Sequence, residues 1–149
     1  MFTDFILASL HHVLIFAMMA IIAFELATVR PGLAGPAIGR LADIDRALGA
    51  VAMGIVVVGV CRVLFGLKGW EAYVSNVWFW HKMGAFVIAA LLSMVPTTRI
   101  LHWRRQAAGD PAFVVPDGEI ARVRRFVHFE AAVFLLIPIF AAAMARYGY

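Results

Sequence analysis

The chain has 149 residues, of which 64% are hydrophobic and only 15% are charged, and its mean hydropathy is +0.90. An average soluble domain is about 45–50% apolar and about 25% charged. This composition excludes a disordered chain, a nucleic-acid-binding module and almost all soluble enzymes, and it predicts an integral membrane protein. The formal net charge of +4 does not indicate nucleic acid here, because the basic residues gather between apolar runs.

Four long apolar runs divide the chain. Each reaches the roughly 20 residues that a helix needs to cross a hydrocarbon core about 30 Å thick. The runs are too long for strands and lack the alternation of a membrane barrel. We therefore expect an all-α fold, a single transmembrane domain over residues 1–149 that forms a four-helix bundle with short connections. The helices are expected at about 5–29, 47–67, 78–101 and 126–145.

The distribution of basic residues predicts an orientation. Nine of the thirteen Lys and Arg residues lie in or beside the first and third connections. They are Arg30, Arg40, Arg46, Arg99, Arg104, Arg105, Arg122, Arg124 and Arg125. Connections rich in Lys and Arg stay in the cytoplasm. We therefore expect a multi-pass protein of the bacterial inner membrane, with arginine-rich cytoplasmic connections and both termini on the outer side.

Ionisable side chains inside the spans are costly, so each is a candidate functional group. Five of them come from three spans near the expected outer boundary: His11, His12, Arg62, His81 and Lys82. Imidazoles on facing helices hold b-type haem in helical bundles. The candidate iron ligands are therefore His11 or His12 with His81. Arg62 and Lys82 are the candidate partners of the haem propionates.

A second polar cluster is expected near the inner boundary, from Glu25, Arg99, His128 and Glu130. In a redox protein, Glu25 or Glu130 would be the catalytic groups that handle protons. Alternatively, these two carboxylates pair with Arg99 or Arg125 and only lock the helices together.

Helical spacing places part of both clusters on one face. His11, Met18 and Glu25 recur every seven residues, so they share one face of the first helix. That face should point into the bundle, because His and Glu would be costly against lipid. His12 lies about 100° around the helix from His11, so at most one of the two points squarely inward.

Nearly the whole chain resembles a bacterial family of short four-helix membrane proteins that carries no assigned activity. The resemblance rests on residues spread over all four runs. They are Leu10-His11-His12 with Glu25, Arg40-Leu41 with Asp43 and Asp45, Gly59 with Arg62, Gly69, Tyr73, Asn76, Phe79, Lys82, Ser93, Pro96-Thr97 and Trp103-Arg104-Arg105. The resemblance implies the architecture and no particular function.

The chain is also distantly similar to the HemJ-type protoporphyrinogen oxidases and to CopD-like membrane domains. HemJ-type proteins have a histidine in the first span, a lysine that opens a later span and Asn-Glu at the start of another. His11 or His12, Lys82 and Glu130 fall in comparable places, although Phe129 stands where that family has Asn. This similarity implies b-type haem and an oxidoreductase activity.

Three functions remain open at this stage. The first is a haem-b-binding protein that transfers electrons, with quinone or another redox partner. The second is an accessory or assembly subunit of a larger membrane complex, without a cofactor. The third is a cation-binding, transporter-like protein, which with four helices would need to form a homo-oligomer. All three have the lipid bilayer as a partner, and none involves nucleic acid.

Overall fold

The computed structural model describes residues 2–67 and 69–147, and in this part of the chain it contains helices and no strand. The helices are α1 (Phe2–Thr28), α2 (Pro36–Phe65), α3 (Gly69–Val74), α4 (Val77–Gly109) and α5 (Asp117–Arg146). All except α3 are long and apolar enough to cross a membrane. The predicted all-α fold with four candidate membrane spans is therefore confirmed.

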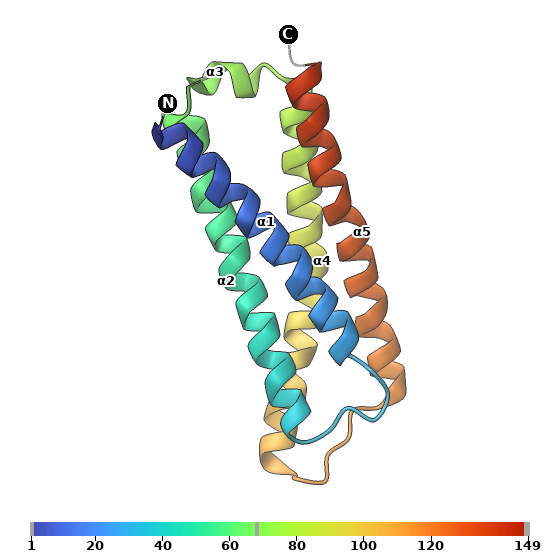
Figure 1. The fold of residues 1–149 in the computed structure, drawn as a ribbon. Coiled ribbons are helices and arrows are strands. Elements are labelled where there is room, and N and C mark those ends of the chain that lie inside the picture. The colour runs from blue at the N-terminus through green and yellow to red at the C-terminus, as the bar shows by residue number, and fades with distance from the viewer. Residues whose placement is uncertain (1, 68, 148–149) are drawn as a thin grey trace.

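The four long helices form two side-by-side pairs (Figure 1). The first helix α1 packs mainly on α2, and α4 packs mainly on α5. The two pairs meet through α2 with α4 and α1 with α5. The connections between α1 and α2 and between α4 and α5 lie at one end, which we call the basic end. The short helix α3 and both chain ends lie at the opposite end.

Three helix ends lie well beyond the apolar runs. Helix α2 begins at Pro36 rather than near 47, α4 ends at Gly109 rather than near 101, and α5 begins at Asp117 rather than near 126. Hydropathy marks only the segment that suits lipid, whereas the backbone can stay helical past the hydrocarbon. Pro36 suits the first turn of α2, where no amide donor is needed. The short helix α3 was not predicted, since six residues give no usable periodicity.

The two connections at the basic end are joined to each other. Ala34 and Val114 form an isolated antiparallel bridge, and the Val115 amide donates to the Leu33 carbonyl over 3.0 Å. Leu33 and Val115 are both buried. This contact closes the basic end across the two helix pairs.

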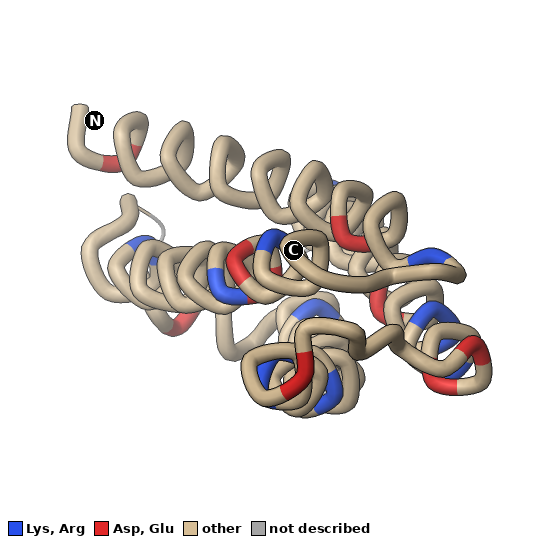
Figure 2. The backbone as a smooth tube through the Cα atoms, turned by 90° about the horizontal axis from the view of Figure 1, so that it is seen from below, with Lys and Arg blue, Asp and Glu red and all other residues tan. Residues whose placement is uncertain are grey.

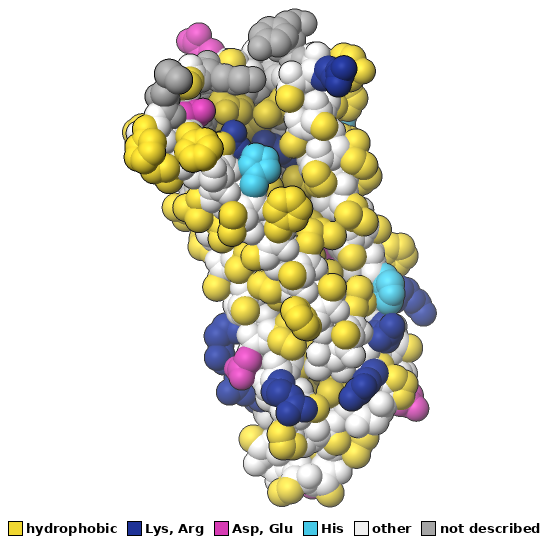
Figure 3. All heavy atoms as spheres, viewed as in Figure 1, with side chains coloured by type: hydrophobic (Ala, Val, Ile, Leu, Met, Phe, Trp, Pro, Cys, Tyr) yellow, Lys and Arg dark blue, Asp and Glu magenta, His cyan; other side chains and the backbone are white. Residues whose placement is uncertain are grey.

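Apolar side chains cover the outside of the helices as well as their interior. Phe16, Phe24 and Ile139 are each at least 60% exposed, and hydrophobic side chains cover the middle of the face in Figure 3. In a soluble protein such a surface would aggregate, whereas a lipid-facing helix requires it. Dark blue Lys and Arg side chains gather toward the basic end in the same view.

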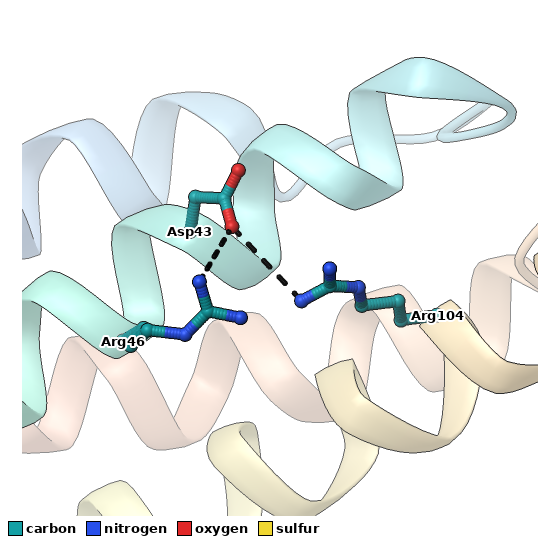
Figure 4. Close-up of polar contacts among 3 residues, drawn as sticks. All are labelled: Asp43, Arg46 and Arg104. Carbon is teal, nitrogen blue, oxygen red and sulfur yellow. Dashed lines mark hydrogen bonds and ion pairs between the residues drawn. The ribbon is translucent and has the colours of Figure 1, made fainter.

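The basic end carries a small ion-pair network. The Asp43 carboxylate on α2 lies 3.2 Å from the Arg46 guanidinium and 4.0 Å from that of Arg104 on α4 (Figure 4). All three side chains are exposed, so the network contributes only about 0–1 kcal/mol per pair. Figure 2 views the molecule from this end and marks the basic and acidic positions along the backbone.

Arg124 joins the two helix pairs more firmly. Its Nη1 atom on α5 donates to the carbonyl oxygens of Leu26 over 2.9 Å and Val29 over 2.7 Å. The Leu26 carbonyl lies in the last turn of α1 and Val29 directly follows the helix, where the last helical acceptors are left unpaired. Arg124 therefore caps α1 from a different pair, and it fixes the depth of α1 relative to α5.

Replacing Arg124 by Met should lower the stability of the folded protein by about 1.5–3 kcal/mol, the usual contribution of hydrogen bonds to a charged group. Thermal unfolding in detergent measures the loss. The control is Arg125→Met, because Arg125 is exposed and forms no ion pair with any residue in the described part of the chain. Equal unfolding midpoints for the two variants would contradict the capping role.

Candidate functional site

A cavity of about 280 Å³ opens between the two helix pairs, at the end that carries α3. Side chains from all five helices line it, and most of them are apolar. Three polar side chains reach it from different helices: His11 from α1, Arg62 from α2 and Lys82 from α4. The structure therefore brings together three of the five side chains predicted for the outer cluster. We call this space the cationic cavity.

The two basic side chains of the cationic cavity have no acidic partner in the described part of the chain. The ion pairs there involve Asp43 and Glu119 only, both near the basic end. The Nε atom of Arg62 is buried and has no hydrogen-bond partner. Lys82 places its Nζ atom 5.4 Å from the centre of the Phe79 ring, which stabilises the ammonium group only modestly. An anion in the cavity would give the Arg62 and Lys82 side chains the acidic partner that they lack.

His11 lies against a glycine of the neighbouring helix. A Cβ atom added to Gly59 of α2 would sit 3.4 Å from Cε1 of the His11 ring. The absence of a side chain at Gly59 therefore lets the imidazole enter between α1 and α2. The Nδ1 atom of His11 is buried without a hydrogen-bond partner. A ring nitrogen in that position can accept a proton, donate one or bind a metal.

The end of the cavity is closed by the α3–α4 junction. Tyr73 of α3 is buried and packs edge-on against Phe79, with 5.8 Å between the ring centres. Asn76 begins α4: its Oδ1 atom accepts from the Trp78 amide over 2.9 Å, and its Nδ2 atom donates to the Met144 carbonyl of α5 over 3.2 Å. This double role holds the junction over the cavity.

The other two histidines predicted for the outer cluster lie elsewhere. His12 is exposed, with its Nδ1 atom 2.6 Å from the Ala8 carbonyl of its own helix. His81 is also exposed, with its Nδ1 atom 2.9 Å from the Val77 carbonyl, and its ring lies 5.7 Å from that of Phe140. The structure therefore does not bring His11 or His12 together with His81 in the cationic cavity, and their pairing as iron ligands stays a prediction. Adjacent helical residues differ by about 100° in direction, and Lys82 takes the inward position.

The three histidines also do not gather as a metal centre. Among residues 2–67 and 69–147, no group of three or more His, Cys, Asp or Glu side chains is placed to hold a metal ion. His11 is the only one of the three that lines the cationic cavity in the described chain.

The inner cluster contains carboxylates from three helices. Glu25 of α1 and Glu130 of α5 are 0% and 1% exposed, and Asp45 of α2 is 6% exposed. Glu25 lies close enough to Glu130 and Asp45 for their charges to interact. Met18 and Glu25 are both buried, as their shared face with His11 predicted.

The basic residues expected beside these carboxylates pair differently. Arg99 lies 3.6 Å from Glu119 rather than from Glu25 or Glu130. His128 is exposed and bonds the Arg124 carbonyl one turn earlier. Neither Arg99 nor Arg125 forms an ion pair with Glu25 or Glu130 in the described residues, so the structure does not show the expected pairs. Glu119 lies in the first turn of α5. The α4–α5 connection brings this turn close to Arg99 of α4.

The family described as "Predicted membrane protein (DUF2214)" matches residues 3–148, which is nearly the whole chain. The chain belongs to this family. The match confirms the expected resemblance to a family of short membrane proteins with no assigned activity. No curated protein and no solved structure matches the chain. The more distant similarity to HemJ-type and CopD-like proteins stays a prediction.

Sequence reasoning missed one member of the inner cluster of this DUF2214 chain. Asp45 accepts a hydrogen bond from Thr97 of α4, with 2.7 Å between Oδ1 and Oγ1. A signal was present, because Leu41, Asp45 and Leu48 share a helical face and both leucines are buried. Asp45 lies just before the span expected at about 47–67, so it was not counted among the ionisable side chains inside the spans.

Replacing Thr97 by Val in the DUF2214 chain should lower its stability by about 1–3 kcal/mol, because Asp45 loses its donor while remaining buried. Thr98→Val is the matched control, since Thr98 is exposed and bonds only the Met94 and Val95 carbonyls of its own helix. Thermal unfolding of both variants in detergent measures the difference. A destabilisation no larger than that of the control would show that the Thr97–Asp45 bond contributes nothing.

Proposed function

We propose that this protein binds an amphipathic anion in the cationic cavity, within the outer half of the membrane. The observation that carries the proposal is the convergence of Arg62 and Lys82 on an apolar cavity without an acidic partner among the described residues. Uncompensated cations in an apolar setting are costly unless a ligand or partner neutralises them. The acid groups of the ligand would meet Arg62 and Lys82, and its apolar body would meet the rest of the lining.

The apolar lining supports an amphipathic ligand rather than a free inorganic anion. It includes Ile15, Ile55, Val63, Phe86, Phe134 and Ile137. The cavity volume of about 280 Å³ lies near the lower end of the range of about 300–1,000 Å³ that is usual for small-molecule sites. A space of this size suits the acid end of a ligand and part of its apolar body.

Among amphipathic anions, we propose b-type haem as the ligand. His11 would bind the iron, and Arg62 and Lys82 would bind the two propionates. His81 and His12 lie off the cavity, so His11 would be the single protein ligand among the three histidines. When bound, haem supplies one-electron redox chemistry. The redox role, with quinone or another membrane redox partner, follows from this proposal and is a prediction, as are a homo-oligomer and a larger complex.

The His11 ligand should be visible in the absorbance of the purified protein. The dithionite-reduced minus oxidised spectrum of the full chain, made in haem-replete cells, is expected to show b-type haem bands. His11→Ala should abolish them, whereas His12→Ala should keep them, because His12 is exposed on the neighbouring face. No haem in the native protein, or full haem in His11→Ala, would exclude haem with this ligand.

A second arm of this experiment tests the anion site without haem. The probe is a fluorescent fatty acid added to protein from haem-depleted cells, with its neutral methyl ester as the comparison. Arg62→Gln and Lys82→Gln should each weaken binding of the acid by about 10–100-fold, the equivalent of one charge-assisted hydrogen bond. Binding of the ester should not change. The proposed function falls if these variants affect neither haem nor fatty acid.

We further propose that the basic end lies in the cytoplasm of a bacterial inner membrane, with both chain ends outside. The concentration of Lys and Arg at that end supports this orientation. It places the cationic cavity on the outer side.

Single cysteines test this orientation. In a Cys61→Ala background, Ala112→Cys in the α4–α5 connection should react with a membrane-impermeant thiol reagent only after the membrane is opened. Ser75→Cys, which lies between α3 and α4 and is exposed, should react in intact spheroplasts. The reverse pattern would invert the proposed orientation.

A further inference from the structure

Two buried glutamates in the inner cluster have carboxylate oxygens without a hydrogen-bond partner in the described part of the chain. Glu25 is 0% exposed and Glu130 is 1% exposed. Neither carboxylate oxygen of Glu25 has a hydrogen-bond partner, and the same is true of Oε2 of Glu130. A buried carboxyl group without a partner is rare and costly when it is ionised, so it needs a physical explanation.

No cation neutralises these carboxylates in the described part of the chain. The other charged group facing Glu25 from α2 is Asp45, which is also acidic. The α4 side chains here are uncharged: Thr97 donates to Asp45, and Ser93 lies beside Glu130. Arg124 of α5 reaches the end of α1, but its Nη1 atom donates to two backbone carbonyls there. The site is therefore a set of three acids without an internal counter-ion.

Apolar layers separate this site from both ends of the molecule. Met18, Ile22 and Phe134 are buried on the side of the cationic cavity. Val29, Ile100 and Val127 are buried on the side of the basic end. Two like charges that are enclosed in this way repel each other strongly and gain no hydration. Binding of a proton removes one charge and creates an O–H donor for the neighbouring carboxylate oxygen.

We propose that Glu25 and Glu130 form an occluded proton-binding site, in which at least one of the two carries a proton at neutral pH. The proton leaves or enters when the apolar layers separate. This site is distinct from the cationic cavity and does not depend on the ligand proposed there. The site takes a proton rather than a metal ion. Its polar groups are three carboxyl groups and two hydroxyls, and in the described chain the carboxyl groups are not placed to hold a metal ion together.

Infrared spectroscopy of the full chain in lipid nanodiscs tests this directly. A protonated carboxyl group has its own C=O stretching band, which ionised carboxylates lack. At neutral pH the native protein is expected to show this band, and its shift in D₂O should be slow because the site is enclosed. Glu25→Gln or Glu130→Gln should remove a component of the band. Glu71→Gln, at an exposed carboxylate of α3, should leave it unchanged.

Several results would overturn the proposal. The first is the absence of a carboxylic-acid band in the native protein at neutral pH, which needs no variant to fold. The second is a band that disappears only in Asp45→Asn. The third is a band that exchanges in D₂O as fast as that of an exposed acid.

Stability against pH gives an independent readout. If the folded chain holds a proton that the unfolded chain releases, the folded state binds more protons at neutral pH. Stability then falls as the pH rises, and the decline is complete only when the folded site itself loses the proton. Glu25→Gln and Glu130→Gln should flatten this decline of the unfolding midpoint, whereas Glu71→Gln should keep it. An unchanged decline in both buried variants would contradict the proposal.

Discussion

The interior of a bilayer offers no water to hydrogen-bond a polar group, and this constraint decides where the polar side chains of the protein lie. The inward-facing ionisable groups occupy two levels. His11, Arg62 and Lys82 line the cavity near α3, and the carboxylates of Glu25 and Glu130 lie closer to the basic end. Apolar side chains separate the levels. The basic and acidic groups of the two levels therefore form no ion pair with each other in the described part of the chain.

The seven-residue repeat on α1 determined how much of this arrangement could be predicted. His11, Met18 and Glu25 share a face, and the structure directs that face inward: Met18 and Glu25 are buried and His11 lines the cavity. A histidine and a glutamate on one stripe can avoid lipid in only one way, so the sequence was sufficient here. It was also sufficient to state that His11 and His12 could not both point squarely inward.

The contact partners of individual polar side chains could not be predicted, because they depend on which helices pack against each other. Adjacent His81 and Lys82 gave no sign of which one faces the cavity, since the apolar residues around them fit either direction. Arg99 pairs with Glu119 because the short α4–α5 connection brings the start of α5 to it. Asp45 was missed because it lies just outside the apolar run expected to cross the membrane. In each case the residue type was informative, and the contact was set by packing between distant parts of the chain.

The polar contacts that join the two helix pairs are distributed unevenly. Arg124 on the α1 carbonyls, Thr97 on Asp45, Arg104 beside Asp43 and the bridge between Ala34 and Val114 all join the pairs in the half toward the basic end. In the half that holds the cationic cavity, the described residues show no hydrogen bond or ion pair between the α1–α2 and α4–α5 pairs; the bonds of Asn76 stay within α4 and α5. Polar contacts therefore hold the two helix pairs together in the half that contains the buried carboxyl groups. In the half that contains the cavity, the described residues show no such polar contact between the pairs. A ligand can enter the cavity by separating apolar side chains alone, whereas exchange of the enclosed proton has to displace layers held in place by these polar contacts.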